Sequence, residues 1–543
     1  MGEPTNSCGV CTASALSVLS PPTTPPPTPM TPHNTRQSIA ARILDGEHLF
    51  ILNGQLIRVP QKWLSAHPGG ALTILHFIGR DATDEVEAYH PKHVIETMRA
   101  FSQGPVQLSQ DGWVPLLPPI HTGWIRKPSP DGLLRWHKEA TPDISEDLAP
   151  SQILLVTKSD ASLASGPSSA SIQPPPTTLS PRIQAQHSAA YKELHKRVIA
   201  ADLYQTRYIS GYGPEVARYI FFALSSYLLY QRHQFFLSAV FLGVLWHQLV
   251  FLCHDLGHLG VTHNWYKDRL IAIFLADFVG GLSIGWWVHS HNVHHIVPNH
   301  PSHDPDIQHL PFFAITPTFF KSLYSSYYKR ELTFDRFSQA MITVQHRIFY
   351  AVMSLARFNL YHLSYRHLWI TRNEPSKARG GRWVWWLEVF AVLGFFSWYA
   401  SALRGTCSWK TGLMYLFVSN MVPSPLHVQI VLSHYSRSTA DLGPTESFPH
   451  RQLRTTTDVI CHPLVEFLHG GLHLQVTHHL FPRLPRHNLK EASYLQGLEY
   501  AEFGFFEGNG EVRDTLRGVA NQLRILKMVA DSEIQEAMNA KTD

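Results

Sequence analysis

Cysteine is scarce in this chain, with only 5 among 543 residues. So few cysteines offer no disulfide framework, and the number is typical of a protein that faces the reducing cytosol. Cys8 and Cys11 form a Cys-x-x-Cys motif, but they have no second pair to complete a zinc site and lie in a Pro/Thr-rich stretch. We therefore interpret this motif as incidental.

Charge is low as well, and the N-terminus has no apolar run. Asp, Glu, Lys and Arg together make up 16% of the residues, and the formal net charge is +4. This balance argues against a nucleic-acid partner. The first residues do not combine a basic start with an apolar segment, so no signal peptide is predicted. We expect membrane insertion to rely on internal segments.

Histidine, by contrast, is abundant and clustered. The chain holds 34 histidines, of which ten lie between His254 and His309 and nine between His427 and His487. On a helix, residues three or four apart share one face, so a single turn can direct several imidazole nitrogens toward one point. Neutral imidazole binds iron well, and three clusters after apolar segments predict a metal site rather than structural histidines at a membrane edge. The clusters are His254-Asp-Leu-Gly-His258, His291-Asn-Val-His294-His295 and Gln475-Val-Thr-His478-His479.

A second motif lies far upstream, in the segments Trp63-Leu-Ser-Ala-His67-Pro68-Gly69-Gly70, Gly79-Arg-Asp81-Ala-Thr83-Asp84 and His90-Pro91. It resembles the haem-binding core of cytochrome b5. The resemblance implies that His67 and His90 bind one haem b from opposite faces. With both axial positions filled, the haem passes electrons and does not readily bind oxygen.

The residues around His67 fit this interpretation. Gly69 and Gly70 remove the Cβ atoms that would block a close approach of the loop, and Pro68 stiffens the turn. His76 and His93 lie nearby but miss the matching positions. We interpret both as ordinary polar residues.

Composition changes along the chain predict four parts. A β-hairpin with Asn53-Gly54 at its turn is expected near the start of the second part. The third part contains a Ser/Pro-rich stretch, 141–190, which is typical of a flexible tether. The parts are a disordered Pro/Thr-rich tail (1–38), an α+β cytochrome b5-like haem domain (39–112), a linker (113–190) and an all-α membrane domain (191–543).

Four apolar stretches in the last part approach the ~20 residues that a bilayer crossing requires. They form two predicted helical hairpins, 216–231 with 235–253 and 384–403 with 409–432. Two further stretches, 270–288 and 341–361, are short or interrupted by charge. We interpret these two as interfacial or half-buried helices.

The positions of the clusters agree with this topology. If the N-terminal half is cytosolic, each hairpin returns the chain to the cytosol before a histidine cluster. The segment from Lys321 to Arg382 carries eleven Lys/Arg against three Asp/Glu, and such an excess favours the cytosolic side. We therefore expect the haem domain and all three clusters to face the cytosol.

The order of a b5-like module followed by three histidine boxes resembles the front-end desaturases, the b5-fused branch of the membrane fatty-acyl and sphingolipid desaturases. Within that branch the chain is most similar to fungal sphingolipid 8-desaturases. The resemblance covers nearly everything from about 39 to 500 except the linker. Leu256 stands where desaturases usually have Ala or Ser, a position that is not a ligand. The matching motifs are Trp286–His295, His303–Phe313 and Gln475–His487.

This resemblance implies a di-iron site on the cytosolic side. Seven nitrogens are few for two metal ions, and His434, at the end of the last apolar segment, is the candidate for an eighth ligand; a structural polar role is its alternative. Gln475 replaces a histidine found in other desaturases, and its weaker amide oxygen would ligate directly or through water. The implied ligands are His254, His258, His291, His294, His295, His478 and His479.

The resemblance also implies an activity: introduction of a C8–C9 double bond into the long-chain base of ceramide, in glucosylceramide synthesis. The reaction would use O2 and electrons delivered through the chain's own haem, with NADH-cytochrome b5 reductase as their source. The implied location is the endoplasmic reticulum membrane, crossed several times.

Three other functions share some of these features. A front-end desaturase acting on acyl-CoA or phospholipid would carry the same boxes. Lipid hydroxylases fused to b5 use similar iron chemistry, but their boxes are spaced differently and usually lack the leading Gln. A metal transporter would place its ligands inside the membrane spans and would have no use for haem.

Overall fold

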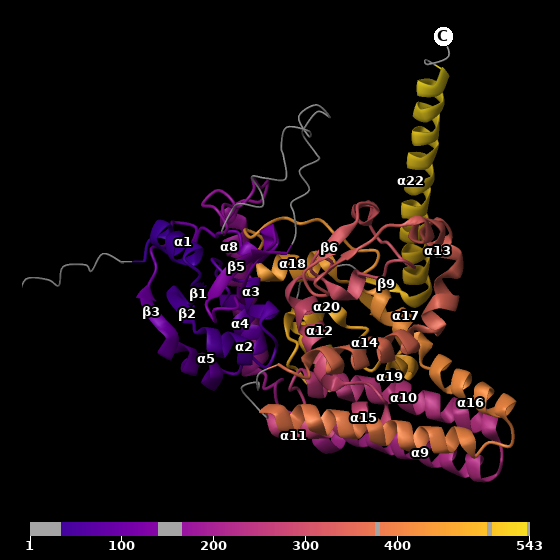
Figure 1. The fold of residues 1–543 in the computed structure, drawn as a ribbon. Helices are drawn as coiled ribbons and strands as arrows, with labels where there is room; N and C mark the ends of the chain where they lie inside the picture. Colours follow the sequence, from indigo (N-terminus) through magenta and orange to yellow (C-terminus); the bar gives the residue numbers. More distant parts are fainter. Residues whose placement is uncertain (1–33, 140–165, 375–380, 497–501, 540–543) are drawn as a thin grey trace, which may run out of the picture.

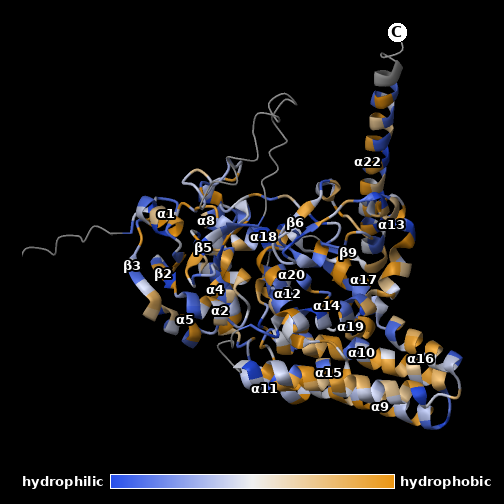
Figure 2. Ribbon diagram, in the orientation of Figure 1, coloured by the Kyte–Doolittle hydropathy of each residue, from blue (hydrophilic) through white to orange (hydrophobic). Residues whose placement is uncertain are grey.

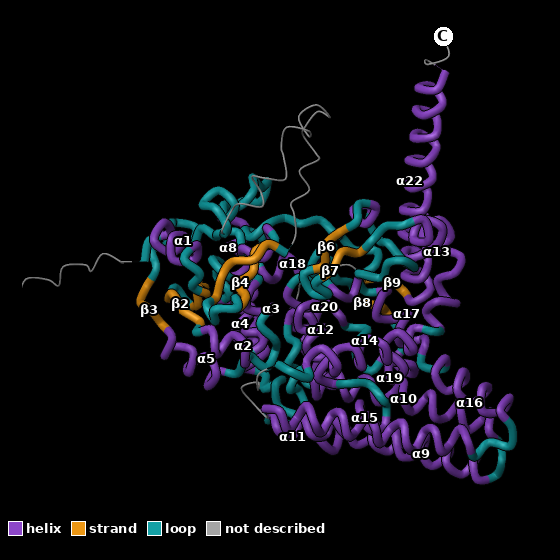
Figure 3. The backbone as a smooth tube through the Cα atoms, in the orientation of Figure 1, coloured by secondary structure: helices purple, strands orange, loops and turns teal. Residues whose placement is uncertain are grey.

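Two regions of different secondary structure lie side by side in the computed structural model, which describes residues 34–139, 166–374, 381–496 and 502–539. The first region mixes short helices and strands, and the second is mostly helical (Figures 1 and 3). Residues 1–33 of the expected disordered tail, and 140–165 of the expected tether, lie outside the described residues.

The predicted β-hairpin is confirmed in the first region. Strands β1 (His48–Leu52) and β2 (Gln55–Val59) pair antiparallel, and Leu52 lies opposite Gln55. Asn53 and Gly54 join them with φ angles of 51° and 72°, the two positive values that a type I′ turn requires. The third strand, β3 (Ser102–Pro105), pairs with β2.

The elements of the first region continue beyond the expected boundary at residue 112. Trp113 donates from Nε1 to the Gly79 carbonyl, and Trp136 donates from Nε1 to the Leu44 carbonyl. These contacts fold 113–139, the first part of the expected linker, onto the b5-like core. The remaining elements are α1 (Arg36–Leu44), α2 (Gln61–Ala66), α3 (Leu72–Leu75), α4 (Thr83–Tyr89), α5 (Lys92–Met98), η1 (Arg99–Phe101), η2 (Pro119–Thr122), β4 (Trp124–Pro128) and β5 (Leu134–Lys138).

The second region begins with α8 (Pro181–Ala200), which starts within the expected linker and extends past its end at residue 190. The region is not purely helical, because it holds two short strand pairs, β6 (Leu323–Ser325) with β7 (Arg330–Leu332) and β8 (Asp458–Ile460) with β9 (Glu502–Gly504). Among the remaining elements are η4 (Tyr208–Tyr212), η6 (Pro305–Ile307), η7 (Pro317–Phe320), α13 (Arg336–Ser354), α14 (Ala356–Thr371), α18 (Phe448–Thr455), η8 (Pro463–Val465), α19 (Glu466–His469), α20 (Gln475–Leu480), η9 (Arg486–Asn488), α21 (Leu489–Gln496) and α22 (Phe505–Asn539).

Four helices lie along one edge of this region: α9 (Gly213–Gln231), α10 (Phe235–Gly257), α15 (Gly381–Arg404) and α16 (Trp409–Met421) (Figure 1). Apolar residues predominate on them (Figure 2). Among the described residues, α10 and α15 are long and apolar enough to cross a membrane. The expected span 409–432 is broken, because α16 ends at Met421 and α17 (Ser424–Leu432) begins after Pro423.

The b5-like region packs directly against the second region. Phe50 and Leu72 share a buried apolar cluster with Val293 and Ile296 of α12 (Ile284–Ile296). A neighbouring cluster joins Ala88 of α4 to α8 and α20. This packing brings the helix that carries the second histidine cluster beside the haem-binding motif.

Candidate metal centre and haem site

A sharp bend before α12 directs the second histidine cluster inward. The helical segment formed by α11 (Trp265–Ala272) and η5 (Ile273–Val279) meets α12 at 111°. Gly281 takes a φ of 73° in the break and lies against the ring of Phe395, where a Cβ atom would clash. Ser283 then caps α12 by accepting a hydrogen bond from the Trp286 N–H. The predicted helix 270–288 is therefore two segments, and the bend places the three histidines of the second cluster, His291, His294 and His295, in the interior.

The first candidate metal-binding group contains histidines from all three predicted clusters. One ring nitrogen of each member lies within 4.8 Å of the others, and all members are buried. The Nε2 atom of His295 lies 3.0 Å from Nε2 of both His291 and His478. Such a convergence of imidazole nitrogens is typical of a metal centre. The group consists of His254, His258, His291, His295 and His478.

A second group of three buried histidines adjoins the first. It consists of His294, His434 and His479. The ring of His479 stacks on His295, with 4.1 Å between centroids, so the two groups are in direct contact. His434, proposed from sequence only as the end of an apolar segment, lies 4.6 Å from His294 between ring centroids. The structure thus gathers all eight histidines named as ligands into two adjacent groups.

The second group is held by outer hydrogen bonds that fix its ring nitrogens. His294 donates from Nδ1 to Asp304 at 2.9 Å, and His479 donates from Nδ1 to the Gln452 side-chain oxygen at 2.9 Å. His434 donates from Nδ1 to the Thr455 carbonyl at 3.1 Å. Because Nδ1 of each ring donates to a partner outside the group, Nε2 faces the group. Outer hydrogen-bond partners orient metal-binding histidines in the same way.

Several inward nitrogens satisfy the donor requirements of a metal ion. The Nε2 atoms of His254, His258 and His479 are buried without a hydrogen-bond partner. Burial, with His434 and other histidines nearby, lowers the pKa of His479 well below its usual value, and burial likewise lowers the pKa of His478. Neutral imidazoles with unshared lone pairs fit metal ions closely.

Gln475, the first residue of α20, lies beside the second group. Its Nε2 atom is 3.4 Å from Nε2 of His434, and its side chain is buried. Its position is next to the ligands, as expected for a residue that replaces a histidine of the third box.

The two histidines of the upstream motif face each other at separate helix ends. His67 caps α2 and His90 caps α4, and their ring centroids are 6.1 Å apart. His67 donates from Nδ1 to the Gly70 carbonyl at 3.2 Å, and His90 donates from Nδ1 to the Val86 carbonyl at 3.0 Å. Burial lowers the pKa of His67 to about 4 and that of His90 to about 3. Both rings are therefore neutral with Nε2 free, which fits bis-histidine coordination of haem iron.

Tyr89 connects the two sites. It precedes His90 in the chain, and its ring lies 6.2 Å from the ring of His295 between centroids, edge to face. Its hydroxyl is buried without a hydrogen-bond partner. Tyr89 is thus next to His90 in the chain and beside the first histidine group in space.

Sequence reasoning missed the outer partners Asp304, Gln452 and Thr455. Asp304 stands in the motif His303–Phe313, which carries part of the family resemblance, but its pairing with His294 depends on the loop after α12 folding back. Gln452 and Thr455 lie on α18, far from any box, and carry no signal in the sequence.

Comparison with known proteins supports the division into two regions. Residues 232–507 match the family described as "Fatty acid desaturase", and residues 35–123 match the "Cytochrome b5-like Heme/Steroid binding domain". The second match begins before the expected boundary at 39 and ends after the expected boundary at 112, in agreement with the extra packed elements.

Curated relatives match nearly the whole chain. The "Delta 8-(E)-sphingolipid desaturase" of Emericella nidulans is 41% identical over 93% of this chain and 97% of its own length. The protein of the same name from Lachancea kluyveri is 38% identical over 93% of this chain and 96% of its own length. "Delta(8)-fatty-acid desaturase 2" of Arabidopsis thaliana is 29% identical over 85% of this chain and 88% of its own length. With its buried histidine groups and its haem-type histidine pair, this chain belongs to the fatty acid desaturase family and carries a cytochrome b5-like domain ahead of the desaturase domain.

Proposed function

We propose that this protein is a sphingolipid 8-desaturase, which introduces an (E) double bond between C8 and C9 of the long-chain base of ceramide, on the path to glucosylceramide. The observation that carries the proposal is the likeness to relatives named Delta 8-(E)-sphingolipid desaturase, at 36% to 41% identity over at least 90% of the chain. Membership of the desaturase family removes the metal-transporter alternative.

The histidine groups are proposed to hold two iron ions. The first group would hold one ion and the second group the other, with His434 as a direct ligand. Iron bound there supplies, with O2, the oxidising power that acid and base side chains lack for an unactivated C–H bond. In balance, the substrate loses two hydrogen atoms while O2, two electrons and two protons yield two waters. The chain's own residues hold the imidazoles in place and exclude bulk water.

Electrons are proposed to pass from the haem domain within the same chain. His67 and His90 would hold the haem, which NADH-cytochrome b5 reductase would reduce. The contact of Tyr89 with His295 supports a short route from the His90 edge to the metal centre. Because the haem domain is packed against α12, delivery needs no large domain movement.

The protein is proposed to cross the endoplasmic reticulum membrane four times, through α9, α10, α15 and the broken helix formed by α16 and α17. Large apolar side chains on the outside of these helices support the proposal, since lipid would cover them. The haem domain and the histidine groups would lie on the cytosolic side, where α10 ends. The exposed side chains include Ile220, Phe221 and Leu224 on α9, Trp386, Phe390 and Leu393 on α15, and Leu413 and Phe417 on α16.

This arrangement accounts for a double bond placed near the polar end of the substrate. Ceramide anchored by its headgroup at the cytosolic surface would enter the helices tail-first. The depth of the metal centre then sets the distance from the headgroup at which the chain reacts.

The deciding experiment is expression of the full chain in a host without this activity, followed by mass spectrometry that locates double bonds in sphingoid bases and acyl chains. We expect new C8–C9 unsaturation in the sphingoid base only. New unsaturation confined to glycerolipid acyl chains would overturn the proposal in favour of a front-end acyl desaturase.

A further inference from the structure

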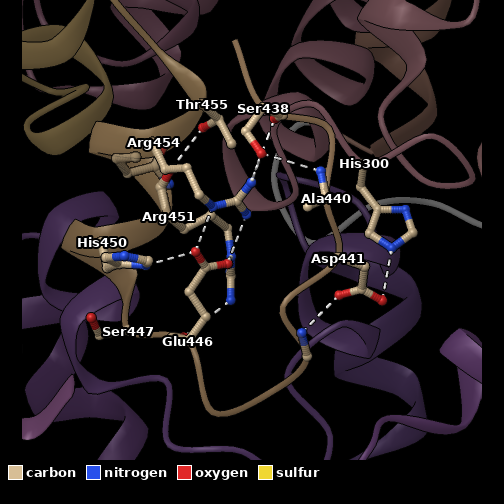
Figure 4. A network of polar contacts seen from close by, with 12 residues as sticks. His300, Ser438, Ala440, Asp441, Glu446, Ser447, His450, Arg451, Arg454 and Thr455 are labelled. Atoms are coloured by element: carbon tan, nitrogen blue, oxygen red, sulfur yellow. Dashed lines mark hydrogen bonds and ion pairs between the residues drawn. The ribbon is translucent and has the colours of Figure 1, made fainter. Parts of the chain in front are cut away.

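A further cluster of histidines, separate from the three sequence clusters, lies outside the metal centre, where the b5-like region meets the desaturase domain. His76 caps α3 and His121 lies in η2, whereas His300 and His303 lie in the loop after α12. Asp441, in the loop before α18, is 3.4 Å from Nε2 of His300 (Figure 4). Four separate stretches of chain therefore bring four imidazoles and a carboxylate together.

The ring nitrogens of this cluster converge as closely as those of the metal centre. One nitrogen each of His76, His121 and His303 lies within 4.8 Å of the others, and the same is true of the ligand atoms of His121, His300 and Asp441. Nδ1 of His76 is 3.2 Å from Nε2 of His121. The rings of His121 and His303 are 4.6 Å apart between centroids.

A buried ring nitrogen of this cluster has no hydrogen-bond partner among the residues that the structure describes. The Nε2 atom of His76 is buried without a hydrogen-bond partner, and the His76 side chain is fully buried. Burial, followed by the proximity of His121 and His300, lowers the pKa of His76 well below its usual value. Burial also lowers the pKa of His121 to about 3. The group therefore presents neutral nitrogens, the form in which histidine binds metal.

We propose that His76, His121 and His303 bind a zinc ion, with His300 and Asp441 closing the site on its outer side. Imidazole and carboxylate ligands suit zinc, and a buried site closed by protein ligands is typical of structural zinc. The ion ties the b5-like region to the desaturase domain.

The experiment measures metals in purified full-length protein by inductively coupled plasma mass spectrometry, beside haem from its absorbance. We expect one zinc per chain in addition to iron and haem. Zinc K-edge absorption should report nitrogen and oxygen donors at about 2.0–2.1 Å. His121→Gln and His303→Gln should each remove the zinc while haem and iron remain, and His303→Asp, which restores a ligand atom, should recover it.

His93→Gln is the matched control, because His93 is an exposed histidine of the same domain. It should leave zinc unchanged. Wild-type protein that carries full haem and iron, contains no zinc and binds none when titrated with Zn²⁺ alone would overturn the proposal, even if the Gln variants fail to fold. Zinc retained in folded His121→Gln and His303→Gln proteins would overturn it as well.

Discussion

The haem-type pair is His67 and His90, and the histidine cage is the set of eight buried histidines in the two adjacent groups described above. The pair and the cage differ in how the chain builds them. His67 and His90 come from one continuous stretch inside a small domain, and each is fixed by a carbonyl of its own neighbourhood. The cage draws its members from α10, α12, α20 and the turn after α17, and outer partners on α18 and in loops orient them. A locally built site can fail alone, whereas a site assembled from distant segments fails as a unit.

The largest effect is expected from the cage ligands. His258→Ala, His294→Ala and His479→Ala should each abolish product and lower bound iron, because residues that act as one unit are about as damaging to lose singly as together. Haem content should stay at the wild-type level, measured by absorbance beside iron analysis. His487→Ala, outside the box, is the control and should be milder. Full activity in His294→Ala would refute the cage.

The converse test removes the haem pair. His67→Ala should lose the low-spin bis-imidazole absorption spectrum and turnover, yet keep its iron, since only electron delivery is cut. The wild-type spectrum should also appear when residues 34–139, which contain the helices and strands of the first region, are expressed alone. A spectrum that His67→Ala leaves unchanged would remove His67 from the haem site.

Asp304 tests how far the cage depends on its outer partners. Asp304→Asn keeps the shape of the side chain but weakens the hydrogen bond to His294 Nδ1. Loss of such a partner typically costs about 10- to 100-fold in metal affinity or activity. We expect a loss of that size in iron affinity, measured by competition with a chelator, and no change in haem. A full wild-type iron affinity would assign Asp304 to the fold alone.

The features that the sequence predicts are those built from one continuous stretch of chain, and the features it misses are those assembled from distant segments. The β-hairpin, the haem pair and the three boxes are local patterns in the sequence, and the structure brings them together as predicted. His434 was foreseen because it ends an apolar segment. Its partners Gln452 and Thr455 were not, because no local pattern links α18 to a box.

Helix boundaries and buried polar clusters are also predicted poorly from the sequence. Hydropathy alone predicted a single apolar segment at 409–432, but Pro423 lacks a backbone N–H and breaks the helix there. His76 was interpreted as an ordinary polar residue, whereas it is fully buried against His121 and His303. Its partners lie in other segments, so only the folded chain reveals the cluster.

The junction between the two sites gives a smaller and more specific effect. Tyr89→Leu removes the ring that contacts His295, and it should slow reoxidation of reduced haem by several-fold in stopped-flow absorbance measurements. Tyr89→Phe keeps the ring and should retain the wild-type rate, because the hydroxyl has no hydrogen-bond partner. Equal rates in Tyr89→Leu and wild type, with iron and haem intact, would exclude this route.

Gln475 is expected to give the smallest effect on metal content. It adjoins His434 of the second group, so Gln475→His should retain both iron and haem. A stronger imidazole donor at this place would change the electron density at the second group, so turnover should fall although the metal stays bound. Comparing iron content with the rate of product formation separates the two effects. Loss of iron in Gln475→His would show that the amide side chain holds the cage together, whereas unchanged turnover would show that the position tolerates either donor.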